Sequence, residues 1–203
     1  MPDLCAALRG LLPPGAGVAQ TDPCADHPLW PGEHLPGATP ARLREFAAGR
    51  AAFRAALADA GLPPMALPIT ADRSPAWPSG LALSITHTAG TCLAAVLPGA
   101  RGLGIDLEPD EDLPSDLIPL ILTAQEPADP RTARLIFSAK EAAYKAIYPL
   151  TRRVIGFDAM RVIPGDTLIA TLLATCPPFS AGHVLTGRSH QGGGSILTAF
   201  AVS

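Results

Sequence analysis

The sequence predicts an α+β fold of two pseudo-symmetric lobes, each a small antiparallel sheet with packed helices. Its 23 Pro and 19 Gly in 203 residues favour short elements joined by turns. A helical pattern followed by alternating strands occurs in each half of the chain. We expect residues 1–105 to form the N-terminal lobe and residues 106–203 the C-terminal lobe, with the active site at their junction.

The N-terminal half begins with a short expected helix near residues 3–12, followed by irregular structure to residue 38. Thr39-Pro40 is typical of a helix cap with proline at the first helical position, and Gly61 ends that helix. The helix carries an apolar stripe formed by Leu43, Phe46, Phe53 and Leu57. Arg50 falls on the same stripe.

Three strands are expected next. Apolar residues alternate with small or polar ones from Leu81 to Thr86, which predicts a half-buried strand ending at His87. A turn through Thr88-Ala89-Gly90 leads to a strand over 91–97, and another strand is expected over 103–108. Two hairpins would make these a three-stranded antiparallel meander.

The C-terminal half repeats the order of helix and strands. Helices are expected over residues 116–122 and from Ser138 to just before Pro149. Strands separated by turns rich in glycine and proline are expected over 160–164, 167–173, 184–187 and 195–202.

Composition and charge exclude several classes of protein. Hydrophobic residues make up 48% of the chain and charged residues 16%, which argues against a disordered chain or a coiled coil. A net charge of −3 offers no broad basic surface for nucleic acid. We see no membrane span and no secretory signal, and expect a cytoplasmic monomer. Four widely spaced cysteines indicate neither a zinc site nor a redox pair.

The pentapeptide Gly104 to Glu108 contains a pair of acids. The strand period of two places Ile105 and Leu107 on the core face and Asp106 and Glu108 on the other. Their Cα atoms would lie roughly 6.5 Å apart, close enough for both carboxylates to reach one hard cation. An ordinary amphipathic strand with a solvated acidic face is the alternative.

The segment Phe137 to Lys145 holds a second group of charges. Ser138 and Glu141 match a capping box with Phe137 at the staple position. Among 15 basic residues the chain has only two lysines, Lys140 and Lys145, which indicates a need for a compact ammonium group unless chance or solubility placed them together. Together with the acid pair, these residues suit a magnesium-dependent reaction on a phosphate ester.

These segments resemble the 4'-phosphopantetheinyl transferases, whose motif pair is G-I-D-x-E and F-S-x-K-E-x-x-Y/F-K. Three upstream blocks resemble the branch that contains the enterobactin-synthase transferase: Phe46 to Arg50 with Arg54, Arg73 to Pro75 with Trp77-Pro78, and Ser84 to His87. The resemblance covers about residues 40–150. Thr86 stands where the family more often has serine and keeps the hydroxyl, and Leu107 replaces the commoner isoleucine.

The resemblance implies a holo-[carrier protein] synthase that moves the phosphopantetheine arm of coenzyme A, its co-substrate, to a serine of an apo acyl, peptidyl or aryl carrier protein. The other product would be 3',5'-ADP. Asp106, Glu108 and Glu141 would hold Mg²⁺, or Mn²⁺, against the diphosphate. Glu141 would draw the proton from the serine, directly or through water, and Lys145 would stabilise the leaving phosphate with help from Lys140.

The resemblance also implies contacts to the nucleotide and to the carrier. Residues at the family's phosphate-contacting positions are Arg54, Arg73, Thr86 and His87. Arg50 is either a further ligand or a paired core arginine. Arg152-Arg153 and the apolar segment 154–157 are candidates for the carrier surface, unless they form an ordinary exposed loop.

Two other functions fit parts of the pattern. One is a non-catalytic module that keeps the fold only to bind coenzyme A or a nucleotide. The other is a metal-dependent phosphohydrolase that uses the same carboxylates. The sequence leaves open whether a siderophore, polyketide or fatty-acid carrier is served.

Overall fold

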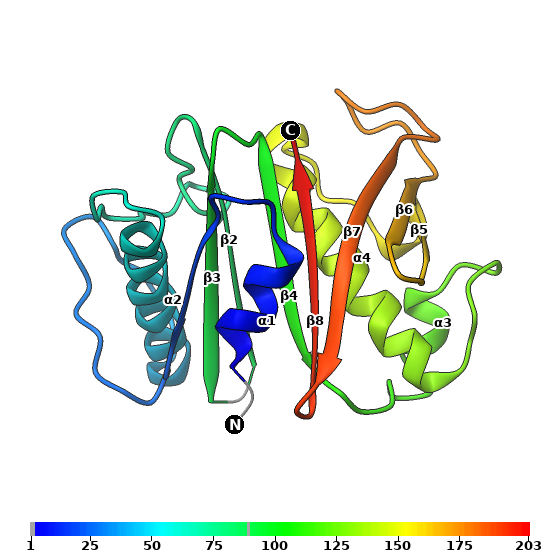
Figure 1. Cartoon of the computed structure of the whole chain (residues 1–203), viewed down its shortest axis with the longest axis horizontal. Helices are drawn as coiled ribbons and strands as arrows, with labels where there is room; N and C mark the ends of the chain where they lie inside the picture. The colour runs from blue at the N-terminus through cyan, green and yellow to red at the C-terminus, as the bar shows by residue number, and fades with distance from the viewer. Residues whose placement is uncertain (1–2, 89) are drawn as a thin grey trace.

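Two antiparallel sheets lie side by side in the molecule, with one long helix packed on each (Figure 1). The structure is a computed structural model that describes residues 3–88 and 90–203. The expected turn at 88–90 contains Ala89, which lies outside the described residues. No helix in the described residues is long and apolar enough to cross a membrane.

The first sheet has the strand order β1-β3-β2, formed by Gly17–Thr21, Thr91–Pro98 and Leu81–Thr88. Helix α2, Pro40–Asp59, packs on it, and its cap is Thr39 as expected. The expectation of irregular structure after the first helix, α1 at Leu4–Leu11, is wrong because β1 follows it. A Cβ at Gly17 would lie 2.1 Å from the Ala56 carbonyl oxygen, so this glycine lets β1 approach α2 closely.

The second sheet has five strands in the order β4-β8-β7-β6-β5. Their bounds are Gly102–Pro109 for β4, Met160–Ile163 for β5, Leu168–Leu172 for β6, Val184–Gly192 for β7 and Ser195–Val202 for β8. The expected meander is therefore wrong, because β4 pairs along its whole length with β8 and not with β3. The chain changes from one sheet to the other between β3 and β4, ahead of residue 105.

Helix α4, Pro130–Thr151, covers the second sheet and is longer than expected. Asp129 caps it and Pro130 occupies its first turn, so Ser138 lies inside the helix and the capping-box interpretation is wrong. The buried Ser138 hydroxyl instead forms a 2.9 Å hydrogen bond with the Thr198 hydroxyl on β8. Pro149 is tolerated in the last turn. Between β4 and α4, helix α3 is limited to Ile118–Ile121, and the 3-10 helix η1, Phe157–Ala159, precedes β5.

The two sheets meet where β2 runs beside β4. No backbone ladder joins these strands, and side-chain hydroxyls of β2 take its place. The Ile105 N–H donates to Ser84 Oγ at 3.0 Å, and the Leu107 N–H donates to Thr86 Oγ1 at 3.2 Å. A Cβ at Gly104 would lie 1.8 Å from the Ala142 carbonyl oxygen, so glycine allows α4 to press against β4. This seam brings the acidic strand, the His87 strand and α4 together.

Candidate active site

A cavity of about 720 Å³ opens beside this seam. Its lining residues come from both halves of the molecule. It is lined by α2, the turn before β2, strands β2 and β4, and the second half of α4. The charged and aromatic residues of its wall are Arg42, Glu45, Phe46, Arg50, Asp72, Arg73, Trp77, His87, Asp106, Tyr144, Lys145 and Tyr148.

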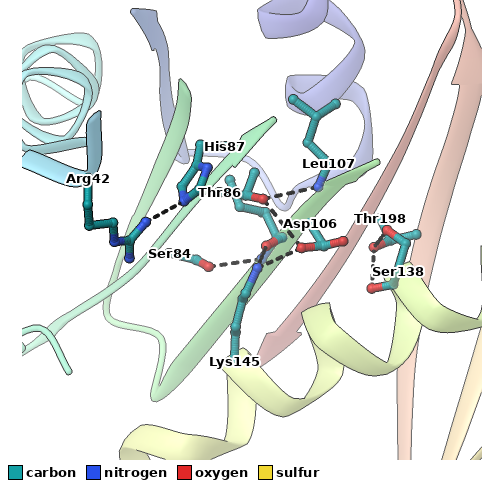
Figure 2. A network of polar contacts seen from close by, with 10 residues as sticks. Arg42, Ser84, Thr86, His87, Asp106, Leu107, Ser138, Lys145 and Thr198 are labelled. Carbon is teal, nitrogen blue, oxygen red and sulfur yellow. Dashed lines mark hydrogen bonds and ion pairs between the residues drawn. The ribbon is translucent and has the colours of Figure 1, made fainter. Parts of the chain in front are cut away.

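Asp106 is the acid at the centre of the site (Figure 2). Its Oδ1 accepts from Lys145 Nζ at 2.6 Å and from Thr86 Oγ1 at 3.3 Å. Its Oδ2 is buried and has no hydrogen-bond partner among the described residues. A buried carboxylate oxygen without a donor is costly, so this atom is suited to a cation or to a donor from a ligand.

The charge of Asp106 acts on both Glu108 and Glu141, although neither glutamate lines the cavity. Burial raises the pKa of each glutamate, and the charge of Asp106 raises it further. Arg134 lowers the pKa of Glu108 through a 2.8 Å bond to Oε2, while Lys145 lowers that of Glu141. A divalent cation would relieve this mutual repulsion.

The three acids fit Mg²⁺ in chemistry, since hard cations prefer carboxylate oxygens and Asp106 has one to spare. Over residues 3–88 and 90–203, no three histidine, cysteine or acidic side chains are already gathered as a metal site. Lys145 and Arg134 hold one oxygen each of Asp106 and Glu108. Asp106 is thus the ligand that the geometry favours most, and Glu108 and Glu141 would have to turn toward it.

At the other side of the cavity, Arg42 Nη1 lies 2.8 Å from His87 Nε2 and 2.9 Å from Glu45 Oε2. Because the guanidinium can only donate, His87 accepts at Nε2 and carries its proton on Nδ1. Burial lowers the pKa of His87, which favours this neutral form. Sequence reasoning did not single out Arg42. Its spacing of eight residues from Arg50, a little over two helical turns, is the signal that could have found it.

Arg50 packs as a core arginine and also lies at the cavity. Its Nε donates to the Leu67 carbonyl at 3.2 Å, and its guanidinium lies 3.6 Å from the centre of the Phe46 ring. Burial lowers the pKa of Arg50 to about 10. It also lines the cavity, as do Arg73 and Thr86.

Arg54 is not placed as the resemblance implied. Its Nη1 donates to both carboxylate oxygens of the buried Glu33 at 2.9 and 2.8 Å, its Nη2 donates to the Pro28 carbonyl at 2.9 Å, and the guanidinium lies over the Trp30 ring. It does not line the cavity. The expectation of a phosphate ligand is therefore corrected for Arg54, because Glu33 takes its Nη1 and the Pro28 carbonyl takes its Nη2.

Lys140 is also displaced from the site. Its Nζ donates to the Ile121 carbonyl at 2.7 Å, to Glu126 Oε2 at 2.8 Å and to the Phe157 carbonyl at 3.0 Å, and the residue is only 2% exposed. Five residues along a helix correspond to about 140° of rotation, so Lys140 and Lys145 lie on different faces of α4. This corrects the expectation that Lys140 assists at the leaving phosphate.

Aromatic residues to which the sequence analysis gave no site role form the wall beside α4, although Trp77 belongs to one of the upstream blocks. Trp77 contacts Tyr148, whose ring also contacts Tyr144, with ring centres 6.1 and 5.5 Å apart. The Arg152 guanidinium lies 4.8 Å from the centre of the Trp77 ring, and Val154 is 83% exposed at the cavity rim. The spacing of four between Tyr144 and Tyr148 was available in the sequence as a shared helix face.

Two family profiles match most of the chain. The profile of the 4'-phosphopantetheinyl transferase N-terminal domain matches residues 30–97, and that of the 4'-phosphopantetheinyl transferase superfamily matches residues 102–199. The two matched regions divide between β3 and β4, where the chain changes sheets.

Individual relatives extend the likeness over most of the chain. The 4'-phosphopantetheinyl transferase Svp of Streptomyces mobaraensis is 38% identical over 195 residues, covering 86% of this chain and 79% of that protein. The transferase PptT of Mycobacterium tuberculosis is 40% identical, covering 58% and 56%. Enterobactin synthase component D of Salmonella typhi is 31% identical, covering 84% and 77%. The chain therefore belongs to the 4'-phosphopantetheinyl transferase superfamily and is a transferase of this class.

Proposed function

We propose that this chain transfers the 4'-phosphopantetheine arm of coenzyme A to a serine of an apo carrier protein in a Mg²⁺-dependent reaction. The observation that carries the proposal is the Asp106–Lys145 pair at the wall of the cavity, with the buried Oδ2 of Asp106 left without a donor. A carboxylate suited to a cation and an ammonium suited to a phosphate thus lie at one point. Relatives named as transferases of this arm support the same substrate class.

In the proposed reaction the serine Oγ attacks the phosphorus that bears the pantetheine arm. A new P–O bond to serine forms as the bond to the nucleotide phosphate breaks, and 3',5'-ADP leaves. The serine proton passes to Glu141 or to a water beside it. Lys145 stabilises the charge that develops on the leaving phosphate.

Bound Mg²⁺ would supply charge neutralisation at the diphosphate. Asp106 is the first candidate to hold it, with Glu108 and Glu141 as partners. The nucleotide phosphates would meet the basic side of the cavity, where Arg42, Arg50, Arg73 and His87 line the wall. Thr86 contributes through its bond to Asp106 and not by a free hydroxyl.

The carrier would approach at the end of α4. Arg152 and Arg153 are exposed there, and Val154 at the cavity rim offers an apolar contact. This local positive patch suits an acidic partner even though the whole chain has a net charge of −3.

The experiment is to incubate the protein with coenzyme A, Mg²⁺ and a panel of apo siderophore, polyketide and fatty-acid carriers, and to weigh each carrier by mass spectrometry. At least one carrier should gain the mass of the phosphopantetheine arm. Binding of coenzyme A with no gain on any carrier would favour the non-catalytic module. Release of inorganic phosphate without a carrier would favour the hydrolase.

A further inference from the structure

A polar contact links the turn before β2 to helix α4 across the edge of the cavity. The Tyr148 hydroxyl donates to Asp72 Oδ2 at 2.7 Å. Asp72 belongs to the part of the chain that leads into the first sheet, whereas α4 packs on the second. Both residues line the cavity, so this bond joins two of its walls.

The other oxygen of Asp72 organises the turn itself. Asp72 Oδ1 accepts from the Ser74 N–H at 3.0 Å and also from the hydroxyls of Thr70 and Ser74. A bridge between Ile69 and Pro75 closes the base of the turn. Because Asp72 uses one oxygen for the turn and one for Tyr148, it couples the shape of the turn to the position of α4.

Arg73 follows Asp72 at the tip of this turn and has a left-handed backbone with φ +66°. Such a conformation costs roughly 1 kcal/mol or more for a residue other than glycine, so neighbouring contacts must maintain it. The Arg73 side chain lines the cavity. Arg73 is the basic residue that this turn contributes to the cavity lining.

Tyr148 is also tied to the reacting end of the site. It lies three residues after Lys145 on α4, and such a pair shares a helix face. Because Asp72 adjoins Arg73, the bond between Asp72 and Tyr148 links the backbone that carries Arg73 to the helix that carries Lys145. The hydrogen bond to Asp72 raises the pKa of Tyr148, and hydrogen bonds from Ser74, Thr70 and Tyr148 lower the pKa of Asp72.

We propose that Tyr148 is a positioning residue that, through Asp72, holds the Arg73 turn against α4 and so preorganises the cavity for the phosphates of coenzyme A. This inference rests on the proposed function, because it concerns the affinity of the same cavity. The bond is partly exposed and contributes little to global stability. Its effect is on the geometry of binding.

The test is calorimetric titration of coenzyme A into the protein with Mg²⁺ and no carrier. Tyr148→Phe removes only the hydroxyl and keeps the ring against Trp77 and Tyr144, and we expect it to weaken binding roughly fivefold. In turnover, KM for coenzyme A should rise by the same factor, with kcat and the KM for the carrier within about twofold of wild type. Arg9→Gln, which loses an exposed ion pair outside the cavity, is the matched control and should bind as wild type does.

A double-mutant cycle separates a positioning role from an independent one. If Tyr148 acts through Arg73, then Tyr148→Phe should add little to the loss caused by Arg73→Ala. Equal losses in both backgrounds, or wild-type affinity in the folded Tyr148→Phe protein, would overturn the inference alone. If the wild-type protein itself fails to bind coenzyme A, the proposed function fails together with the inference.

Discussion

Lys145 Nζ lies 2.6 Å from Asp106 Oδ1, although the two residues are 39 positions apart and come from a helix and a strand. The same ammonium lies 3.3 Å from the Ile105 carbonyl oxygen, so β4 holds it at two points. Each of the two motifs thus supplies one half of an ion pair at the cavity wall. In the proposed reaction, this pair sets the distance between the cation site and the leaving phosphate.

Asp106→Asn should lower the rate of transfer by roughly a hundredfold or more, because the amide cannot neutralise a divalent cation as a carboxylate does. The substitution preserves volume, and the partly exposed Lys145 can turn toward water. Activity against a carrier and Mn²⁺ binding followed by electron paramagnetic resonance are the measurements. Retention of wild-type Mn²⁺ affinity would remove Asp106 from the metal site.

Thr86→Val should destabilise the protein by about 1–3 kcal/mol, because the buried Leu107 N–H would lose its acceptor. It should also weaken Mg²⁺ binding, since the Thr86 hydroxyl orients Asp106. Thr86→Ser keeps the hydroxyl and is the control. Denaturant unfolding and Mg²⁺ titration of both variants check this, and equal behaviour of the valine and serine proteins would refute the role assigned to the hydroxyl.

Lys140→Met should reduce the free energy of unfolding by about 3–5 kcal/mol, because it leaves the fully buried Glu126 carboxylate without its cation. Glu126 also accepts from the Thr123 and Val162 N–H groups, so the pair joins α4 to β5 and to the segment after α3. KM for coenzyme A should stay near wild type. A variant of normal stability with a large loss of kcat would instead restore Lys140 to the catalytic group.

His87, at the cavity, should make the stability of the fold depend on pH. Burial lowers the pKa of His87 below its ordinary value of 6.5, so His87 contributes stability that is present above 6.5 and is lost as the pH falls through the lowered value. The midpoint of denaturant unfolding should therefore fall further between about pH 7.5 and about pH 5.5 for wild type than for His87→Gln. An unchanged difference in the variant would show that His87 is not the group responsible.

Local patterns in the sequence predicted the fold class, the cap of α2 at Thr39 and the positions of strands β5 to β8, because each depends on neighbouring residues. Strand β7 nevertheless continues to Gly192, beyond the expected end at residue 187. The pairing of β4 with β8 was missed, since a contact between residues such as Asp106 and Thr198 depends on packing distant in sequence. The longer α4 was missed because the cap at Asp129 competes with a good capping pattern at Ser138.

The candidate site was predicted only in part, because its motifs are local in the sequence whereas its side-chain contacts join residues far apart in the chain. The motifs brought Asp106 and Lys145 forward, and the structure joins them. Nothing local indicated that Glu33, 21 residues from Arg54, would take that guanidinium. The contact between Tyr148 and Asp72 joins residues 76 positions apart, so the spacing of residues in the sequence could not predict it.

The most direct test of the account measures two products of one reaction with wild-type protein, coenzyme A, Mg²⁺ and a responsive apo carrier. We predict that the carrier gains the phosphopantetheine mass while 3',5'-ADP appears in equal amount, and that Asp106→Asn and chelation of the metal both suppress the two signals together. A modified carrier formed at the wild-type rate by Asp106→Asn, or 3',5'-ADP released without modified carrier, would contradict the account.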